Sequence, residues 1–196
     1  GYCGMGCPYN AKRSMLVTMI PDGIDAGVRL FYNSKIDKLV SANGAISSAV
    51  GAGFTVKAKT FVVAGGAINS PALLLRSSAP DPHQRLGLRT FLHPVVISAA
   101  VFDDPVEGWK GAPQTIYTDH FLETQPVDGP IGYKLETPPL HPVIFSSTLP
   151  GFGRAQTELL AKFPNTQALL ALLRDGFHAQ SPGGQVRLRG DGTPLL

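Results

Sequence analysis

A pair of adjacent glycines, Gly65 and Gly66, is the feature of this chain whose position points most directly to chemistry. The pair follows the apolar run Phe61–Ala64, and a Ser-Pro step, Ser70-Pro71, comes shortly after it. A short run of β-branched and aromatic residues without alternation is typical of a strand buried on both faces. Ser is favoured at a helix N-cap and Pro at the first helical position. We therefore predict a buried strand over residues 61–64 and a leucine-rich helix that begins at Pro71.

A strand, a glycine pair and a helix start, in that order, form a layout that α/β proteins use beside a nucleotide. Ligands collect outside the carboxyl ends of such strands, and glycines let another group approach the backbone closely. The same residues would also form a tight strand-to-helix turn that binds nothing. A glycine pair without the full GxGxxG fingerprint does not choose between the two. The residues alone leave both interpretations open.

The cysteines and histidines offer weaker alternatives. Cys3 and Cys7 are the only cysteines in the chain, whereas iron–sulfur and structural zinc sites need about four ligands. We expect a disulfide or two reduced thiols there and no metal site, and the spacing does not decide between those two states. The histidines are spread along the chain without a partner acid or nucleophile, and we expect structural or solvated roles for all five: His83, His93, His120, His141 and His178.

Composition narrows the function classes. The 196 residues are 43% hydrophobic and 16% charged, with a net charge of +3 and a pI near 9.0. The positive charges are scattered, so we predict no nucleic-acid binding, which needs a cationic patch. No apolar run approaches the roughly 20 residues that span a bilayer, so we predict no membrane span. The 22 glycines and 17 prolines lie throughout the chain, which favours many short strands over a helical bundle.

Several elements must position the glycine pair. β-forming segments separated by Asn-Gly and Gly-Ala-Gly turns predict a β-meander in the first third of the chain. After about Leu86, apolar or alternating segments bounded by Pro and Gly predict an antiparallel sheet, including the stretch IGYKLETPPLHPVIFSSTL. Short helices are predicted near Asp22–Ala26 and over Ala155–Lys162. A Pro-rich polar stretch, APDPHQRLG, marks the predicted boundary between two domains, residues 1–80 and 86–196.

The motif VVAGGAINSPALLLRSS resembles the second signature of the glucose-methanol-choline (GMC) flavin oxidoreductases. In that family a strand ends in small residues and is followed by Ser-Pro and a Leu-rich helix. The signature normally closes in Ser-Gly, and Ser77-Ser78 departs from it here. Upstream, NAKRSMLVTMIPDGIDAGVRLFYNSKIDKLV resembles the segment that leads into a strand contacting the FAD adenine. Downstream, LGLRTFLHPVVI is similar to the stretch that leads into the substrate domain.

This resemblance implies an α+β fold: a partial FAD-binding, Rossmann-like region with a β-meander, joined to part of an antiparallel-sheet substrate domain. It implies FAD as the cofactor. By position against the motif, Ile36 would present backbone groups to the adenine, and Ala64, Gly65 and Gly66 would lie near the cofactor. The residue types suit that role, because a flat polar ring is read by backbone N–H and C=O groups where side chains are absent.

The resemblance also implies what the chain does not contain. The family's GxGxxG diphosphate loop does not occur in it, and the catalytic histidine would follow Leu196, so we assign no catalytic residue. We expect a central portion of an oxidoreductase that oxidises the CH–OH group of a small alcohol, inactive alone and weak in FAD binding. Two alternatives are a non-catalytic β-rich binding module and a small electron-transfer protein that uses its cysteines. No targeting signal is present, which favours the cytoplasm, and the oligomeric state is not predicted.

Overall fold

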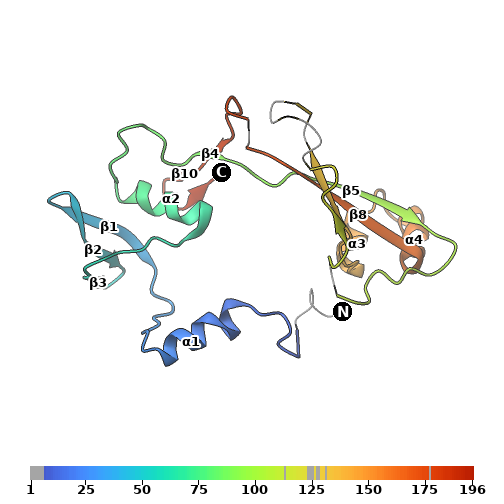
Figure 1. The fold of residues 1–196 in the computed structure, drawn as a ribbon, viewed down its shortest axis with the longest axis horizontal. Helices are drawn as coiled ribbons and strands as arrows, with labels where there is room; N and C mark the ends of the chain where they lie inside the picture. The colour runs from blue at the N-terminus through green and yellow to red at the C-terminus, as the bar shows by residue number, and fades with distance from the viewer. Residues whose placement is uncertain (1–6, 113, 123–125, 127–128, 131, 177) are drawn as a thin grey trace. The chain divides into compact units, whose positions relative to one another are not determined.

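A computed structural model describes residues 7–112, 114–122, 126, 129–130, 132–176 and 178–196 (Figure 1). The chain forms two compact units, each assembled from two separate segments. Unit 1 comprises Gly1–Val28 and His93–Phe177, and unit 2 comprises Arg29–Leu92 and His178–Leu196. The predicted domains, residues 1–80 and 86–196, concern which residues serve a cofactor and which a substrate. Compactness does not test that division, which stays a prediction.

Unit 2 opens with the predicted β-meander. Its three antiparallel strands lie in the order β1-β2-β3, with bounds β1 (Ile36–Ala42), β2 (Ala45–Gly51) and β3 (Phe54–Val56). The β1–β2 loop is the pair Asn43 and Gly44, with φ of +54° and +76°. Positive φ at both loop residues is the type I′ turn that an Asn-Gly pair favours. The meander is thereby confirmed.

Helix α2 (Gly66–Arg76) begins earlier than the sequence predicted, and the prediction of a start at Pro71 was wrong. Gly65 is the N-cap, and Pro71 lies inside the helix. Pro removes only one backbone hydrogen bond, and packing decides whether a short helix forms more than local propensity does. Ala72 is fully buried where α2 packs against β1.

The predicted buried strand over Phe61–Ala64 is wrong as well. The segment has no regular secondary structure, and Val62 is 85% exposed. No hydrogen bond joins its backbone to another described residue. A strand requires a neighbouring strand to satisfy its N–H and C=O groups. None of the described strands lies beside these residues, so their apolar character alone does not make a strand.

The end of α2 covers the outer edge of β1. The Leu39 amide donates to Ser77 Oγ (2.8 Å), which in turn donates to the Leu73 carbonyl (2.6 Å). The Arg76 Nε donates to the Asp37 carbonyl (2.9 Å). β1 is an edge strand, and edge strands carry backbone groups without ladder partners. These side chains supply the missing partners and fix α2 on the meander.

The C-terminal segment returns to the same unit. Strand β4 (Leu88–Thr90) pairs with β9 (Gly184–Gln185), and β10 (Arg187–Leu188) pairs with β11 (Pro194–Leu195). Val186 is 1% exposed, and its amide donates to the Gly87 carbonyl (2.8 Å). Helix α2 contacts both β10 and β11. Residues 187–195 therefore lie against a helix that is more than a hundred positions away in the chain.

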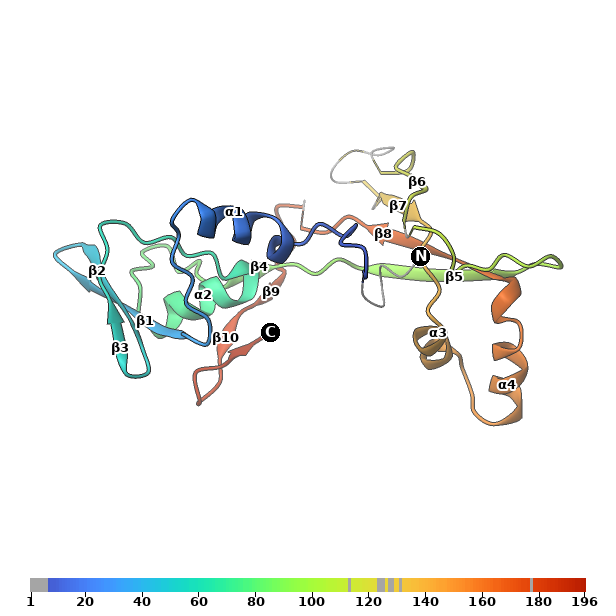
Figure 2. The same ribbon diagram turned by 90° about the horizontal axis from the view of Figure 1, so that it is seen from below.

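Unit 1 contains a four-stranded antiparallel sheet in the order β5-β8-β7-β6, as predicted after Leu86. β5 and β8 run side by side in both views (Figure 1, Figure 2). The bounds are β5 (Val95–Val101), β6 (Tyr117–Thr118), β7 (Tyr133–Glu136) and β8 (Thr166–Leu173). The helical elements are the 3-10 turns η2 (Met15–Val17) and η3 (Phe163–Asn165) and the helices α1 (Met19–Asp25), α3 (Pro142–Thr148) and α4 (Arg154–Leu160).

Helix α3 corrects the strand predicted for the stretch HPVIFSSTL. His141 is its N-cap, and His141 Nδ1 accepts from the Val143 amide (3.2 Å). Pro142 occupies the first turn, where its missing N–H has no intrahelical partner in any case. The capping signal therefore outweighed the β-branched residues. The predicted helices near Asp22–Ala26 and Ala155–Lys162 are confirmed as α1 and α4.

The fold is thus α+β at the level the sequence predicted. Every strand pair among the described residues is antiparallel. The parallel arrangement of a Rossmann-like region is not confirmed and stays a prediction. None of the helices that the structure describes has the length and apolar character needed to cross a membrane.

Candidate cofactor site

Two neighbouring cavities lie in unit 2, between α2, the meander and the C-terminal hairpin. We call the first the polar cavity; it has a volume of about 420 Å³ and is lined by Lys35, Ile36, Gly65, Asn69, Leu73, Arg76, Gly192, Thr193 and Pro194. We call the second the apolar cavity; it measures about 370 Å³ and is lined by Ile36, Leu39, Ala49, Val56, Ala58, Thr60, Phe61, Val62, Val63, Ala64, Gly65 and Leu73. Ile36, Gly65 and Leu73 border both cavities.

The cavities bring together three of the four predicted cofactor residues. Ile36 begins β1, is half-buried and lines both cavities, as does Gly65, while Ala64 lines the apolar cavity. Gly66 lines neither; its φ is +75°, and a Cβ placed on it would meet no atom within 4 Å. The two glycines are exposed rather than enclosed in a hairpin. Their contact with a cofactor stays a prediction, but the open ledge that such contact requires is present.

Gly65 is also required by the helix itself. A Cβ at this position would lie 3.1 Å from the Ser70 amide nitrogen and 3.2 Å from the Asn69 Cβ. Both distances are tighter than ordinary van der Waals contact. A glycine therefore serves the turn into α2 and at the same time leaves the cavity open. The glycine pair has a structural role whether or not a ligand binds.

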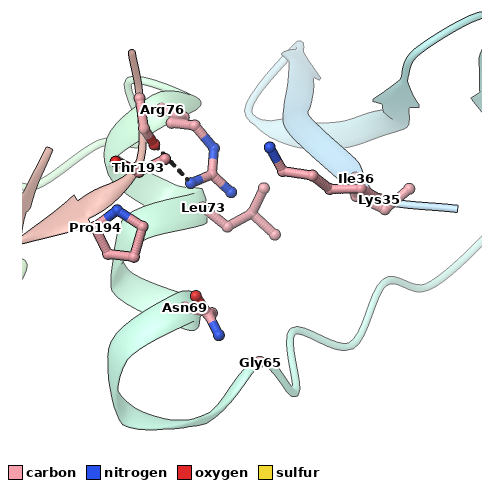
Figure 3. A pocket seen from close by; sticks show the side chains of 9 residues that line it. Lys35, Ile36, Gly65, Asn69, Leu73, Arg76, Thr193 and Pro194 are labelled. Atoms are coloured by element: carbon pink, nitrogen blue, oxygen red, sulfur yellow. Dashed lines mark hydrogen bonds between the residues drawn. The ribbon is translucent and has the colours of Figure 1, made fainter. Parts of the chain in front are cut away.

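Three polar-cavity residues on α2 were missed from the sequence, and one of them, Asn69, precedes the predicted helix start at Pro71. Asn69, Leu73 and Arg76 have the spacing i, i+4 and i+7 and share one face of α2. Figure 3 shows the side chains of Leu73 and Arg76 between the start of β1 and the turn before β11. A helix that begins at Gly66 places all three on one face, so the wrong N-cap hid Asn69. Leu73 and Arg76 follow Pro71, and no motif set them apart as cavity residues.

Arg76 joins three parts of the site. Its Nε donates to the Asp37 carbonyl of β1 (2.9 Å), and one terminal nitrogen, Nη1, donates to the Gly192 carbonyl (3.2 Å). The dashed line in Figure 3 marks the second bond. A guanidinium carries five N–H donors in a fixed planar fork. Two backbone carbonyls thus set the orientation of a cation at the edge of the polar cavity.

The turn before β11 forms a third side of the polar cavity and is stabilised locally. Asp191 Oδ1 accepts from the Thr193 amide (2.9 Å) and from the Thr193 hydroxyl (2.7 Å). The Thr193 hydroxyl, followed by the Thr193 amide, lowers the pKa of Asp191 below its ordinary value. An ionised Asp191 therefore holds the turn that presents Gly192 and Thr193 to the cavity.

The charges that line the polar cavity are positive. Lys35 and Arg76 line it, and no acidic side chain does. Lys35 forms an ion pair with Asp37 (3.3 Å), but the two side chains are 75% and 47% exposed. An exposed ion pair of this kind is weak and exchanges readily with solvent or ligand. The Arg76 cation is held by backbone groups and has no acidic partner among the described residues.

Other residues that could carry chemistry have local roles. His141 caps α3, and His178 Nδ1 accepts from the Gln180 amide (3.3 Å), as expected for structural histidines. Cys7 is a free thiol; Cys3 lies outside the described residues. Several backbone amides that donate to the Cys7 thiol lower its pKa, and the Lys12 amide (3.4 Å) has the largest effect. In the described part of the chain, no three His, Cys, Asp or Glu side chains gather as metal ligands would.

Comparison with known proteins finds relatives of this sequence. A family model described as GMC oxidoreductase matches residues 1–95. An uncharacterized GMC-type oxidoreductase of Mycobacterium tuberculosis is 31% identical over 178 residues, 88% of this chain and 27% of the relative. Another from Sinorhizobium fredii is 34% identical over 139 residues, 66% of this chain and 27% of the relative. A long-chain-alcohol oxidase of Arabidopsis thaliana is 24% identical over 212 residues, 96% of this chain and 28% of the relative.

The chain therefore spans about a quarter of the length of the curated relatives that it matches. The match over residues 1–95 includes the whole segment that carries Ile36, Gly65 and α2. The match therefore also covers the glycine pair and the Ser-Pro step, which lies inside α2. This chain belongs to the GMC oxidoreductase family.

Proposed function

We propose that unit 2 forms part of the FAD site of an oxidoreductase that oxidises the CH–OH group of an alcohol. The observation that carries the proposal is the apolar cavity, bordered by Ile36 at the start of an edge strand and by the side-chain-free Gly65. A flat heteroaromatic ring needs an apolar slot with a few backbone donors and acceptors at its rim. The residues present fit that requirement.

In this proposal the residues of the chain bind and orient, and none performs proton transfer. Ile36 offers main-chain groups, while Ala64 and Gly65 leave room for a ring against the backbone. Bound FAD supplies the electron acceptance that alcohol oxidation requires. Leu39, Ala49 and Leu73 line the same cavity and exclude water from it. The alcohol as substrate is supported by the plant relatives, which are named long-chain-alcohol oxidases.

The test is flavin content of the protein expressed from its complete reading frame. We expect a flavin absorbance band and release of FAD on denaturation. Ala64 lines the apolar cavity and is exposed, so Ala64→Phe should fill the slot without unfolding the chain and should lower bound FAD at least tenfold. The matched control is Ala52→Phe, an exposed position in the β2–β3 turn that lines neither cavity.

Two results would contradict the proposal. One is a protein that neither contains nor takes up FAD at micromolar concentration. The other is an Ala64→Phe variant with the flavin content of the Ala52→Phe control. If FAD binds, alcohols of increasing chain length assayed with an artificial electron acceptor then test the substrate class. We also expect the 196-residue chain on its own to bind FAD more weakly than the product of the complete reading frame.

A further inference from the structure

Strand β5 is the open edge of the sheet in unit 1. The sheet order is β5-β8-β7-β6, so β5 has a neighbouring strand on one side only. All seven of its side chains are exposed, including Val96 (56%) and Ile97 (59%). The strand contains no charged residue and no proline, which are the residues that edge strands commonly use to prevent pairing with another chain. An open and uncharged edge of this kind is suited to the addition of a further strand.

The hydrogen bonds at the two ends of the β5–β8 ladder show which backbone groups of β5 point outward. The Leu173 amide donates to the Pro94 carbonyl, and the Phe102 amide donates to the Asn165 carbonyl (both 2.9 Å). In an antiparallel ladder such bonds recur at every second residue, so the even-numbered residues of β5 bond to β8. The odd-numbered residues direct their N–H and C=O groups away from β8, where the described residues offer no backbone partner. These outward-facing residues are Val95, Ile97, Ala99 and Val101.

The strand is complementary to itself. Its sequence, VVISAAV, has Ser98 at the centre and a valine at each end. Two copies that run antiparallel about Ser98 place Val95 of one copy opposite Val101 of the other. The remaining outward-facing pair is Ile97 and Ala99, a large side chain beside a small one. All four outward-facing residues thereby satisfy one another's backbone groups, and a two-fold interface requires a self-complementary surface of this kind.

The same register is complementary in charge beyond both ends of β5. It brings Asp103 of each copy opposite His93 of the other, because the two residues lie two positions outside the strand on either side. Both residues are exposed, and neither belongs to an ion pair in the described part of the chain. A carboxylate accepts a hydrogen bond from an imidazole N–H. A shifted register that brought the two Asp103 carboxylates together would instead be repulsive.

We infer that the free edge of β5 is a homodimer interface, at which two copies of this chain join their sheets about a two-fold axis between their Ser98 residues. The assembly stops at two copies, because each outer edge of the joined sheet is β6 (Tyr117–Thr118), a strand of two residues. Very short edge strands give little template for further pairing. The inference concerns unit 1 and is independent of FAD binding in unit 2.

Ser98 supplies the test, because its two copies face each other in a non-hydrogen-bonded pair, where opposite side chains are closest. The 196-residue chain is measured by analytical ultracentrifugation over a concentration series, and we expect a dimer. Ser98→Lys and Ser98→Asp each set two like charges against each other, so each should raise the dimer dissociation constant at least tenfold. An equimolar mixture of the two variants should restore the dimer, because lysine then faces aspartate. Restoration also shows that both variants are folded.

A matched variant and a second measurement complete the experiment. Ser147→Lys adds the same charge at an exposed serine of α3 in the same unit and should leave the dimer unchanged. Hydrogen exchange then reports on the edge itself. The amides of the four outward-facing residues should become more protected as the protein concentration rises. The amides of Val96, Ser98 and Ala100 bond to β8 and should not respond to concentration.

The outcomes separate a second copy from other occupants of the edge. Dimerisation that is lost in both single variants and regained in their mixture supports the interface. A chain that stays monomeric throughout the concentration series overturns it, and so does a Ser98→Lys variant that dimerises as well as Ser147→Lys. If the product of the complete reading frame is monomeric while its four outward-facing amides are protected, the edge belongs to polypeptide outside residues 1–196, and the inference is overturned as well.

Discussion

Replacing Ser78 by glycine should stabilise unit 2. Ser78 follows the end of α2 with φ of +48°, a left-handed conformation that L residues with a side chain adopt at a cost. Its amide donates to the Leu75 carbonyl (3.1 Å), and the Ala79 amide donates to the Leu74 carbonyl (3.0 Å). These two bonds define a Schellman motif, in which glycine is the preferred residue at the position of Ser78.

The magnitude follows from the two opposing terms. The left-handed region costs an L residue about 1–2 kcal/mol, and glycine gives up about 0.5–1 kcal/mol because it loses more backbone freedom on folding. The Ser78 side chain is exposed, and no hydrogen bond to its hydroxyl is found among the described residues. We therefore expect Ser78→Gly to raise the free energy of unfolding by roughly 0.5–1 kcal/mol. At roughly 2–4 °C for each kcal/mol, the shift in Tm is small but measurable.

The assay must report on unit 2. The single tryptophan, Trp109, stacks on Phe163 in unit 1, so tryptophan fluorescence follows the wrong unit. Native-state hydrogen exchange of the Ser78 and Ala79 amides reports directly on the end of α2, because these two amides donate the hydrogen bonds of the Schellman motif. Protection should increase in Ser78→Gly and stay equal or fall in Ser78→Ala, which keeps the Cβ. Equal protection in the glycine and alanine variants would refute the reasoning from φ.

Three further changes test separate parts of unit 2. Ser77→Ala removes the acceptor of a buried β1 amide and should lower the free energy of unfolding by about 1–3 kcal/mol in urea titrations; a loss below 0.3 kcal/mol would contradict it. Gly44→Ala, at φ +76° with open space around it, should destabilise the meander by about 1 kcal/mol, whereas Gly190→Ala, also in open space but without a positive φ, should be near neutral. The pKa of Asp81 is lowered chiefly by the Arg85 amide. The stability from this depressed pKa is therefore present above about pH 4 and lost as the pH falls through the folded pKa. In Asp81→Asn, the free energy of unfolding should therefore fall less steeply as the pH is lowered. The same fall as in the wild type would be evidence against a stabilising role of the Asp81 carboxylate.

Local signals in the sequence predicted local structure well. The Asn43-Gly44 pair predicted a turn of the β-meander, and that turn forms as a type I′ hairpin because both residues tolerate positive φ. The Ser-Pro step predicts a helix start on equally local grounds, and that prediction is wrong. Helix α2 has Gly65 as its N-cap, and burial of Ala72 against β1 fixes its position. Packing energy, which no single residue reports, overrode the N-cap preference of Ser70.

The departure of Ser77-Ser78 from the family motif takes on a physical meaning in the structure. Ser77 agrees with the motif, and its hydroxyl bridges the Leu39 amide and the Leu73 carbonyl. The position after it requires positive φ, which explains why glycine is usual there and why serine is tolerated at a cost. The sequence motif identified the position as unusual, and only the backbone conformation shows why.

The third side of the polar cavity lay beyond sequence reasoning, because it depends on a contact between residues far apart in the chain. Arg76 and Gly192 are 116 positions apart, yet their hydrogen bond (3.2 Å) joins α2 to the C-terminal turn. The polar cavity exists only while that turn is docked on α2. Any ligand that binds there must therefore favour the docked state by mass action. Arg76→Met removes the bond to Gly192, so hydrogen exchange at the Thr193 amide, which is bonded to Asp191, should be faster in this variant than in the wild type. A Thr193 amide that exchanges at the same rate in both proteins would show that Arg76 does not hold the turn on α2.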